Sequence, residues 1–257
     1  MCETLITPVG EFFSYDLCIN IGTVLSVILL VALMWKKQKK IKPVLVLLLA
    51  FALTTVLGNY LSTLMRQLAH MNFSDLQALF EMMKENKGNH FLGRVFAIVL
   101  FYPVLFFAIG KFLHVENVKD ALSDSMDGVA FFIVIQHFFS RLGCLMNGCC
   151  YGKPWSGFSG IILPYAEIAY RVFPVQIFEM LGMVILFLIL LWAYKKEKSR
   201  FPIALSGFGI TIFLSEFFMD QKGNYLLAGM NGIQYGALLL VMIACVIIFK
   251  EKGQKKP

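Results

Sequence analysis

Charged residues are scarce in this chain. Only 15% of its 257 residues are Asp, Glu, Lys or Arg, whereas 58% are hydrophobic, and the mean hydropathy is +0.73. A water-soluble globule needs more polar surface than this composition supplies. The scarcity of charge therefore excludes a soluble enzyme or binding module and predicts an all-α, polytopic membrane helix bundle.

Two further absences narrow the class of protein. The Lys and Arg residues, which give a formal net charge of +7, stand in short clusters between apolar runs. No basic face on a soluble domain results, so we expect no nucleic-acid partner. The chain also lacks an evident internal repeat, and it lacks Gly- or Pro-broken helices in matching halves, so a conventional secondary transporter is disfavoured.

Seven apolar runs approach the length that crosses a membrane. They are residues 15–35, 43–65, 90–113, 126–140, 175–194, 201–219 and 233–249. A hydrocarbon layer of roughly 30 Å requires about 20 helical residues, so the fourth and seventh runs are short. We expect a single integral membrane domain, residues 1–257, with about seven transmembrane helices.

The positions of the positive residues predict how this bundle is oriented. Of the 23 Lys and Arg residues, 15 lie in alternate connections, at residues 36–42, 111–119, 195–200 and 250–256. Cytoplasmic loops carry an excess of Lys and Arg. We therefore place these connections inside, which puts the amino terminus outside and the carboxyl terminus in the cytoplasm.

Polar residues at membrane depth gather at the outer end of the predicted bundle. Several are spaced three or four residues apart and so share a helix face. They are His90, Arg94, Gln136, His137, Arg141, Gln176, Glu179, Glu216, Asp220 and Gln234. Because an ionisable side chain facing lipid is costly, we expect a polar cavity open to the outer headgroups. Glu179 and Glu216 either take part in chemistry or neutralise arginines as structural partners, and Arg94 lines the cavity or anchors the helix at the interface.

Two outer loops are predicted. Residues 66–89 form the first, in which apolar residues at helical spacing predict a short helix that lies at the interface or faces solvent. Residues 141–174 form the second, and its first part, residues 141–152, combines an Arg, an Asn and three Cys with several Gly. Such a polar segment at a membrane edge indicates function.

The cysteines of this loop leave several alternatives open. Cys144, Cys149 and Cys150 together with His137 supply four soft donors, the number found in a structural zinc site. Adjacent cysteines are poorly arranged for tetrahedral chelation, so we expect no metal and no other cofactor. A disulfide from Cys144 to Cys149 or Cys150, free buried thiols and a nucleophilic thiol stay open.

Residues 141–152 resemble the signature of the prolipoprotein diacylglyceryl transferase family, which runs Gly-Arg-x-Gly-Asn-Phe-x-Asn-x-Glu-x-x-Gly. Three later segments are similar, in the same order, to the family's His-Pro-Ser-Gln-Leu-Tyr-Glu, Glu-Phe-Phe and Gly-Gln motifs. The matching residues are Arg141, Gly143, Asn147 and Gly152 in the first motif, Pro174, Gln176 and Glu179 in the second, Glu216 in the third and Gln234 in the last. The resemblance extends over most of the chain.

This resemblance implies a multi-pass enzyme of the bacterial inner membrane that moves the diacylglyceryl group of phosphatidylglycerol to the thiol of a prolipoprotein cysteine. It implies that Arg141 holds the lipid phosphate, for which the paired donors of a guanidinium are better suited than an ammonium. We expect catalytic roles for Arg141, His137, His90 and Glu179, and substrate-binding roles for Arg94, Gly143, Asn147, Gly152, Gln176, Glu216 and Gln234.

The chain also departs from the family pattern. Cys149 stands where the family has Glu, Phe173 stands where it has His, and Ile212 and Met219 stand where it has Arg. Because Arg141 is kept while these groups are lost, the phospholipid donor is better supported than the acceptor, which is the prolipoprotein thiol or another nucleophile. The alternative function is a non-catalytic protein of this fold that binds, flips or transports a lipid or small solute.

Overall fold

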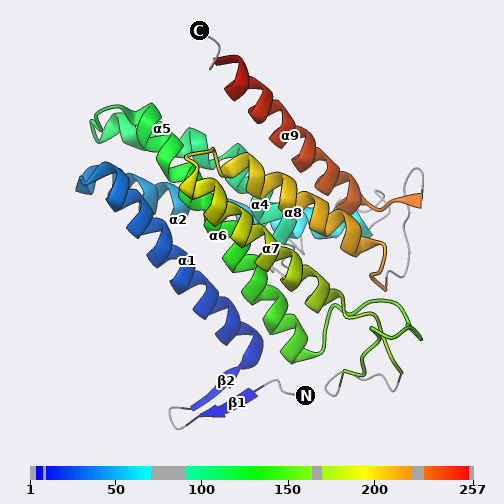
Figure 1. Ribbon diagram of the computed structural model, residues 1–257. Coiled ribbons are helices and arrows are strands. Elements are labelled where there is room, and N and C mark those ends of the chain that lie inside the picture. Colours follow the sequence, from blue (N-terminus) through cyan, green and yellow to red (C-terminus); the bar gives the residue numbers. More distant parts are fainter. Residues whose placement is uncertain (1–3, 8–9, 71–90, 164–169, 221–228, 255–257) are drawn as a thin grey trace. The chain divides into compact units, whose positions relative to one another are not determined.

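The computed structural model describes residues 4–7, 10–70, 91–163, 170–220 and 229–254 (Figure 1). A short antiparallel hairpin, β1 (Thr4–Thr7) and β2 (Gly10–Phe13), leads directly into helix α1 (Ser14–Gln38). The other named elements are α2 (Ile41–His70), α4 (Phe91–Leu100), α5 (Tyr102–Phe112), α6 (Val118–Asn147), α7 (Val175–Lys195), α8 (Phe201–Glu216) and α9 (Gly232–Gln254). Apart from the hairpin, the predicted all-α architecture is confirmed.

All seven predicted apolar runs have helical counterparts. Within the described ranges, five helices are long and apolar enough to span a membrane, namely α1, α2, α6, α7 and α9. The bent pair formed by α4 and α5 gives a sixth span if it is counted as one. Helix α8 has 16 residues, fewer than the roughly 20 that a perpendicular span requires. The count of seven spans and the orientation of the termini therefore stay predictions.

The chain divides into two compact units. Unit 1 comprises residues 1–29, 130–222 and 241–257, and unit 2 comprises residues 30–129 and 223–240. Three of the four boundaries fall inside α1, α6 and α9, and the fourth falls between residues 222 and 223. The single integral domain that the sequence predicts stays a prediction.

In unit 2, α2 packs against α4 and α5. The backbones of α2 and α4 approach closely at Gly93, where an added Cβ would lie 2.5 Å from the Cα of Ser62. Small residues allow such contacts between membrane helices. Helices α4 and α5 are bent by 43° next to Pro103 in the first turn of α5, because proline lacks the N–H that would continue the helical ladder.

Two of the positively charged connections lie at the same end of unit 2. Lys40 forms an ion pair with Glu116, and Gln38 Nε2 donates a hydrogen bond of 2.6 Å to Asp124 Oδ2. Residues 36–42 and 111–119 are therefore on one side, as the alternation of charged connections predicts.

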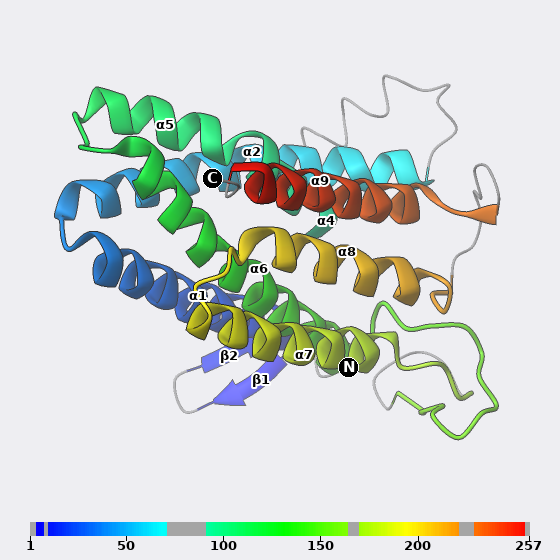
Figure 2. The same cartoon turned by 45° about the horizontal axis from the view of Figure 1, so that its top comes forward.

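In unit 1, helices α7 and α8 run side by side (Figures 1 and 2), and the first half of α1 packs on the last half of α6. A Cβ added at Gly22 would lie 2.6 Å from Phe139 Cβ, and Thr23 Oγ1 donates a hydrogen bond of 3.2 Å to Gln136 Oε1. Large apolar side chains point outward, with Ile28 60% and Leu188 59% exposed. Lipid is the natural environment for such a surface.

Helix α6 is longer than its apolar run of residues 126–140. It starts at Val118 and ends at Asn147, so the signature segment begins inside the helix. The helix stops at Gly148, which has a φ of 68°: Gly148 N–H donates to Leu145 O and Cys149 N–H donates to Cys144 O. This pair of bonds is a Schellman cap. The outer loop predicted to begin at Arg141 thus begins seven residues later.

Candidate active site in unit 1

The buried polar groups of α6 and α7 meet at one carboxylate oxygen. Glu179 Oε2 lies 2.6 Å from His137 Nε2 and 2.6 Å from Arg141 Nε. The side chains of Glu179, His137 and Arg141 are 0%, 1% and 11% exposed. The four-residue spacing predicted that His137 and Arg141 share a face of their helix, and their shared partner confirms this.

Glu179 orients both of its neighbours. Its carboxylate accepts a hydrogen bond from Arg141 Nε–H and one from the imidazole, which donates through Nε2 because an ionised carboxylate has no proton to give. The negative charge also compensates the buried guanidinium, which would otherwise be strongly destabilising. Arg141 uses only Nε for this contact, and its two Nη amino groups make no hydrogen bond to any described residue.

Helix α8 supplies an apolar wall to this cluster. The ring of Phe208, which is fully buried, meets the imidazole of His137 edge to face, with centroids 5.0 Å apart and planes at 89°. The imidazole is therefore held between a carboxylate and an aromatic ring. His137 is closed off from solvent, whereas Arg141 is the most exposed member of the cluster although it is still buried.

Gln176 ties the start of α7 to the signature segment. Its Nε2 donates a hydrogen bond of 2.6 Å to Cys149 O. Its Oε1 is buried and has no hydrogen-bond partner among the residues that the structure describes. Gln176 lies three residues before Glu179 and so on the same face of α7. Gln176 Oε1, which can accept a hydrogen bond from a ligand, therefore lies about one helical turn from the Arg141–Glu179 pair.

The two signature glycines serve packing in this structure. A Cβ at Gly143 would lie 3.0 Å from the ring of Tyr15, and one at Gly152 would lie 2.5 Å from Phe218 O and 2.8 Å from Phe173 O. The Gly152 N–H donates to Phe173 O at 3.0 Å. Close packing explains why glycine is needed at both positions, and direct substrate binding by either stays a prediction.

An aromatic cluster supports the loop after α6, and sequence reasoning missed it. The rings of Phe173 and Phe218 stack with centroids 4.4 Å apart, and Trp155 meets both of them edge to face. The sequence did contain one indication of this cluster, because Phe173, an aromatic residue, stands where the family motif has a histidine. The apolar ring at this position fixes the loop against the end of α8.

The remaining predicted site residues lie on other elements or at other positions. Glu216 is buried at the end of α8 in unit 1, Asn147 is half-buried at the end of α6, and Arg94 belongs to unit 2. Gln234, also in unit 2, caps α9, because Asn231 N–H donates to Gln234 Oε1 at 3.0 Å and Gln234 N–H donates to Asn231 Oδ1 at 2.8 Å. His90 lies outside the described residues. Binding or catalytic roles for these residues stay predictions.

Three cysteines come together beside the cluster. The Sγ atoms of Cys144, Cys149 and Cys150 all lie within 4.8 Å of one another, and the three residues are free thiols. Cys144 is buried and Cys150 is exposed. Hydrogen bonds from the Cys144 and Cys149 thiols lower the pKa of the Cys150 thiol, and the positive charge of Arg141 lowers it further. His137, which was considered as a fourth metal ligand, is instead bound to Glu179.

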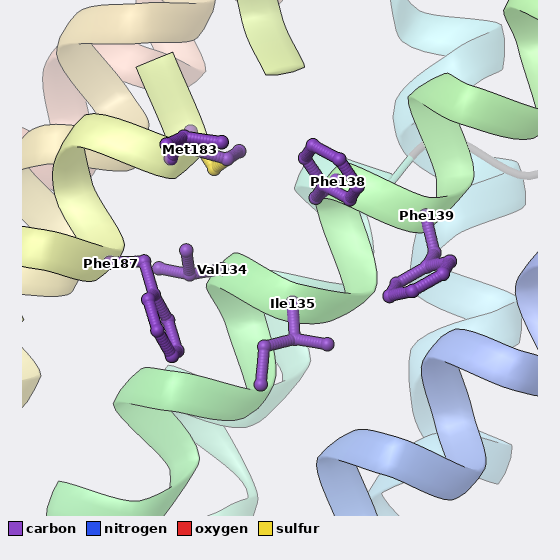
Figure 3. Close-up of a pocket in the computed structure, with 7 residues that line it drawn as sticks. Val134, Ile135, Phe138, Phe139, Met183 and Phe187 are labelled. Atoms are coloured by element: carbon purple, nitrogen blue, oxygen red, sulfur yellow. The ribbon is translucent and has the colours of Figure 1, made fainter. Parts of the chain in front are cut away.

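An apolar hollow of about 190 Å³ lies between α6 and α7 (Figure 3). Its lining residues are Val134, Ile135, Phe138, Phe139, Met183, Val184 and Phe187. It begins close to the polar cluster, because Phe138 follows His137 in α6 and Met183 lies one turn after Glu179 in α7. A charged cluster thus adjoins a space lined by apolar side chains, which suits an amphiphilic ligand.

The spanning helices and the buried polar cluster define a multi-pass membrane protein. The chain belongs to the prolipoprotein diacylglyceryl transferase family, whose profile matches residues 6–252. The resemblance inferred from the motifs is therefore confirmed.

Individual relatives support the same assignment at modest identity. The chain is similar to phosphatidylglycerol–prolipoprotein diacylglyceryl transferases of Clostridium tetani (26% identical over 165 residues, 62% of this chain and 66% of that protein) and Clostridium perfringens (30% over 129 residues, 46% and 49%). It is also similar to that of Polynucleobacter asymbioticus (36% over 109 residues, 40% of each). The matches thus span between 40% and 66% of the lengths of these relatives.

Proposed function

We propose that this protein transfers the diacylglyceryl group of phosphatidylglycerol to an acceptor thiol. The observation that carries the proposal is the geometry of Arg141. Glu179 fixes the guanidinium through Nε, while neither Nη group makes a hydrogen bond to any described residue. Paired N–H donors in one plane match the oxygens of a phosphate. The relatives bear the name of an enzyme for phosphatidylglycerol and prolipoprotein, which supports the same donor.

The apolar hollow supplies the second half of a lipid site. Arg141 follows Val134 by seven residues and Phe138 by three, which corresponds to about 4.5–10.5 Å along the axis of α6. A phosphate bound at Arg141 therefore places the start of an acyl chain at the hollow between α6 and α7. Gln176 Oε1, a buried acceptor without a described partner, is suited to a hydroxyl of the lipid glycerol.

The proposed reaction is a displacement at carbon. The acceptor thiolate attacks the glyceryl carbon that bears the phosphate, a C–S bond forms, and the C–O bond breaks with its electron pair leaving on glycerol phosphate. Arg141 stabilises the charge of the leaving phosphate, which is commonly the largest catalytic contribution in a water-poor site. The thiol proton passes to a general base, which we assign to His137, oriented by Glu179, with His90 as the other candidate.

We place the site at the outer leaflet of the bacterial cytoplasmic membrane. The excess of Lys and Arg in alternate connections predicts a cytoplasmic carboxyl terminus and an outer amino terminus. The outer end of α6 then carries Arg141 at the level of the phospholipid headgroups. A prolipoprotein cysteine is the proposed acceptor, with other thiols as its competitors because Cys149 and Phe173 replace polar residues of the family motifs.

Product analysis tests this proposal. Purified protein is reconstituted in phosphatidylglycerol bilayers with a peptide that carries a membrane-adjacent cysteine, and mass spectrometry follows the peptide and the lipid. We expect the peptide to gain a diacylglyceryl group as glycerol phosphate is released, and a Cys→Ser peptide to stay unmodified. The proposal would be overturned if the lipid stayed intact with every thiol tried, in the same amount for the wild-type protein as for Arg141→Lys. The protein would then only bind or move lipid.

A further inference from the structure

We propose that Cys144, Cys149 and Cys150 form a three-thiolate site for a thiophilic cation of the Cu(I) type. The site is separate from the proposed transfer reaction, because no step of that reaction uses these thiols. It rests on the position of three sulfur atoms, the helix cap that gathers them, and the lack of a fourth ligand within the described residues.

The cap of α6 is what brings the thiols together. Cys149 N–H donates to Cys144 O at 3.1 Å, which folds the chain back so that residue 149 lies over the turn that contains residue 144. Cys150 then adopts a φ of 58°, a left-handed conformation that side-chain-bearing residues adopt at a cost. A strained backbone is kept where the surroundings require it, and here it returns the third thiol to the other two.

The spacing of the sulfur atoms suits trigonal coordination. Metal–thiolate bonds are about 2.3 Å long, so three sulfurs around one cation are about 4.0 Å apart. The three Sγ atoms here lie within 4.8 Å of one another, which leaves less than about 1 Å of contraction. Gln176 holds the Cys149 carbonyl at 2.6 Å, so the turn is already fixed before a ligand arrives. Cys150 is exposed and provides the entry path.

The ligand count favours Cu(I) over zinc. Structural zinc sites are closed by four protein ligands, whereas only these three residues form such a group within the described part of the chain. His137, the fourth soft donor that the sequence suggested, is engaged with Glu179. Soft thiolates select Cu(I), and the guanidinium of Arg141, which interacts electrostatically with Cys144 and Cys150, offsets the negative charge of the thiolates.

A competition titration tests the site. The reduced full-length protein in lipid nanodiscs is titrated anaerobically with Cu(I) against a chromophoric Cu(I) chelator. We expect one equivalent of Cu(I) to be bound, and each of Cys144→Ser, Cys149→Ser and Cys150→Ser to weaken binding at least about tenfold, the effect of losing one ligand bond of about 1.4 kcal/mol or more. The control, Cys245→Ser, changes a cysteine in α9 and leaves the affinity unchanged.

X-ray absorption at the copper edge then counts the ligands. Three sulfurs at about 2.3 Å are expected, and two sulfurs in a linear arrangement would contradict the trigonal site. Equal Cu(I) affinity in the triple Cys→Ser variant would overturn the proposal. Displacement of the bound Cu(I) by Zn²⁺ would also overturn it. The same holds if protein isolated under native conditions contains a disulfide within the cluster that blocks Cu(I) binding. Thermal unfolding of each variant verifies that it is folded.

Discussion

Replacing Arg141 by lysine isolates the geometry of the guanidinium from its charge. The lysine keeps a positive charge against the buried carboxylate of Glu179, so the pair that stabilises α6 against α7 persists. A single ammonium replaces the three nitrogens of Arg141, one of which is bound at 2.6 Å to Glu179 Oε2. The ammonium cannot both hold Glu179 in this geometry and present two parallel donors to a phosphate.

The size of the effect follows from the lost hydrogen bonds. A hydrogen bond that involves a charged group contributes about 1.5–3 kcal/mol, and two such bonds to the leaving phosphate contribute about 3–6 kcal/mol. Each 1.36 kcal/mol changes a rate by about tenfold. We therefore expect kcat/KM for diacylglyceryl transfer to fall by about 10²–10⁴-fold, while the unfolding temperature of the protein changes little.

Release of glycerol phosphate from phosphatidylglycerol bilayers measures this effect. The matched control is Arg171→Lys, a second conservative Arg replacement in unit 1. Arg171 donates from Nε and Nη2 to Gly160 O at 3.0 and 2.6 Å and does not contact the Glu179 cluster. We expect the control to lie within about threefold of wild type, as for most surface changes. Retention of more than a tenth of the wild-type rate by a folded Arg141→Lys protein would refute the proposed role of the Nη groups.

Three further substitutions test the parts around Arg141. Val184→Trp fills the hollow between α6 and α7 from its exposed side and should lower kcat/KM for long-chain donors more than for short-chain ones. The control is Leu188→Trp, one turn further along α7, which should not show this preference. Equal effects of the two substitutions would exclude the hollow as the acyl site. Gly152→Ala forces a Cβ to within 2.5 Å of a carbonyl oxygen and should destabilise the protein by about 1–3 kcal/mol in thermal unfolding. Gly253→Ala, which meets nothing within 4 Å, is its control, and a comparable loss there would contradict the packing argument. Gln176→Met removes the bond to Cys149 O and should cost about 1–3 kcal/mol; an unchanged unfolding temperature would show that this bond does not fix the turn.

The site was predictable from the sequence where it depends on helical spacing within one element. His137 and Arg141 are four residues apart in α6, and this spacing alone places them on one face. Their common partner was not predicted, because Glu179 and Glu216 were expected alike either to take part in chemistry or to neutralise arginines. Sequence spacing does not specify which glutamate of two different helices faces α6, since that depends on how α7 and α8 pack.

Helix ends and side-chain clusters across loops were harder to predict. The charge of Arg141, the glycine at position 143 and the amide of Asn147 suggested that a loop begins at residue 141. Helix α6 continues through all three, because single polar or glycine residues do not prevent a helix whose backbone bonds are satisfied. The convergence of the cysteines depends on the cap at Gly148, and the apparent misfit of adjacent cysteines for chelation disappears once Cys150 takes a left-handed φ. The Schellman cap determines both where α6 ends and how the cysteines converge. Its geometry cannot be predicted from the periodicity of apolar residues in the sequence.

Two of the glycines predicted to bind substrate also have a packing role. Gly143 and Gly152 match the family signature, and each is explained by a neighbouring side chain or carbonyl that leaves no space for a Cβ. Gln234 similarly matches a family motif, and its side chain caps α9 together with Asn231. A residue kept in a motif can therefore serve the fold, the chemistry or both.

A structure with bound phosphatidylglycerol tests the central claim most directly. The measurement is the distance from the phosphate oxygens of the lipid to the nitrogens of Arg141 in the reconstituted protein. We expect two phosphate oxygens about 2.7–2.9 Å from the Arg141 Nη atoms, the length of a charge-assisted hydrogen bond. Nε should still be bound to Glu179, and an acyl chain should lie in the hollow between α6 and α7. A phosphate bound elsewhere, with the Nη groups paired to protein, would contradict it.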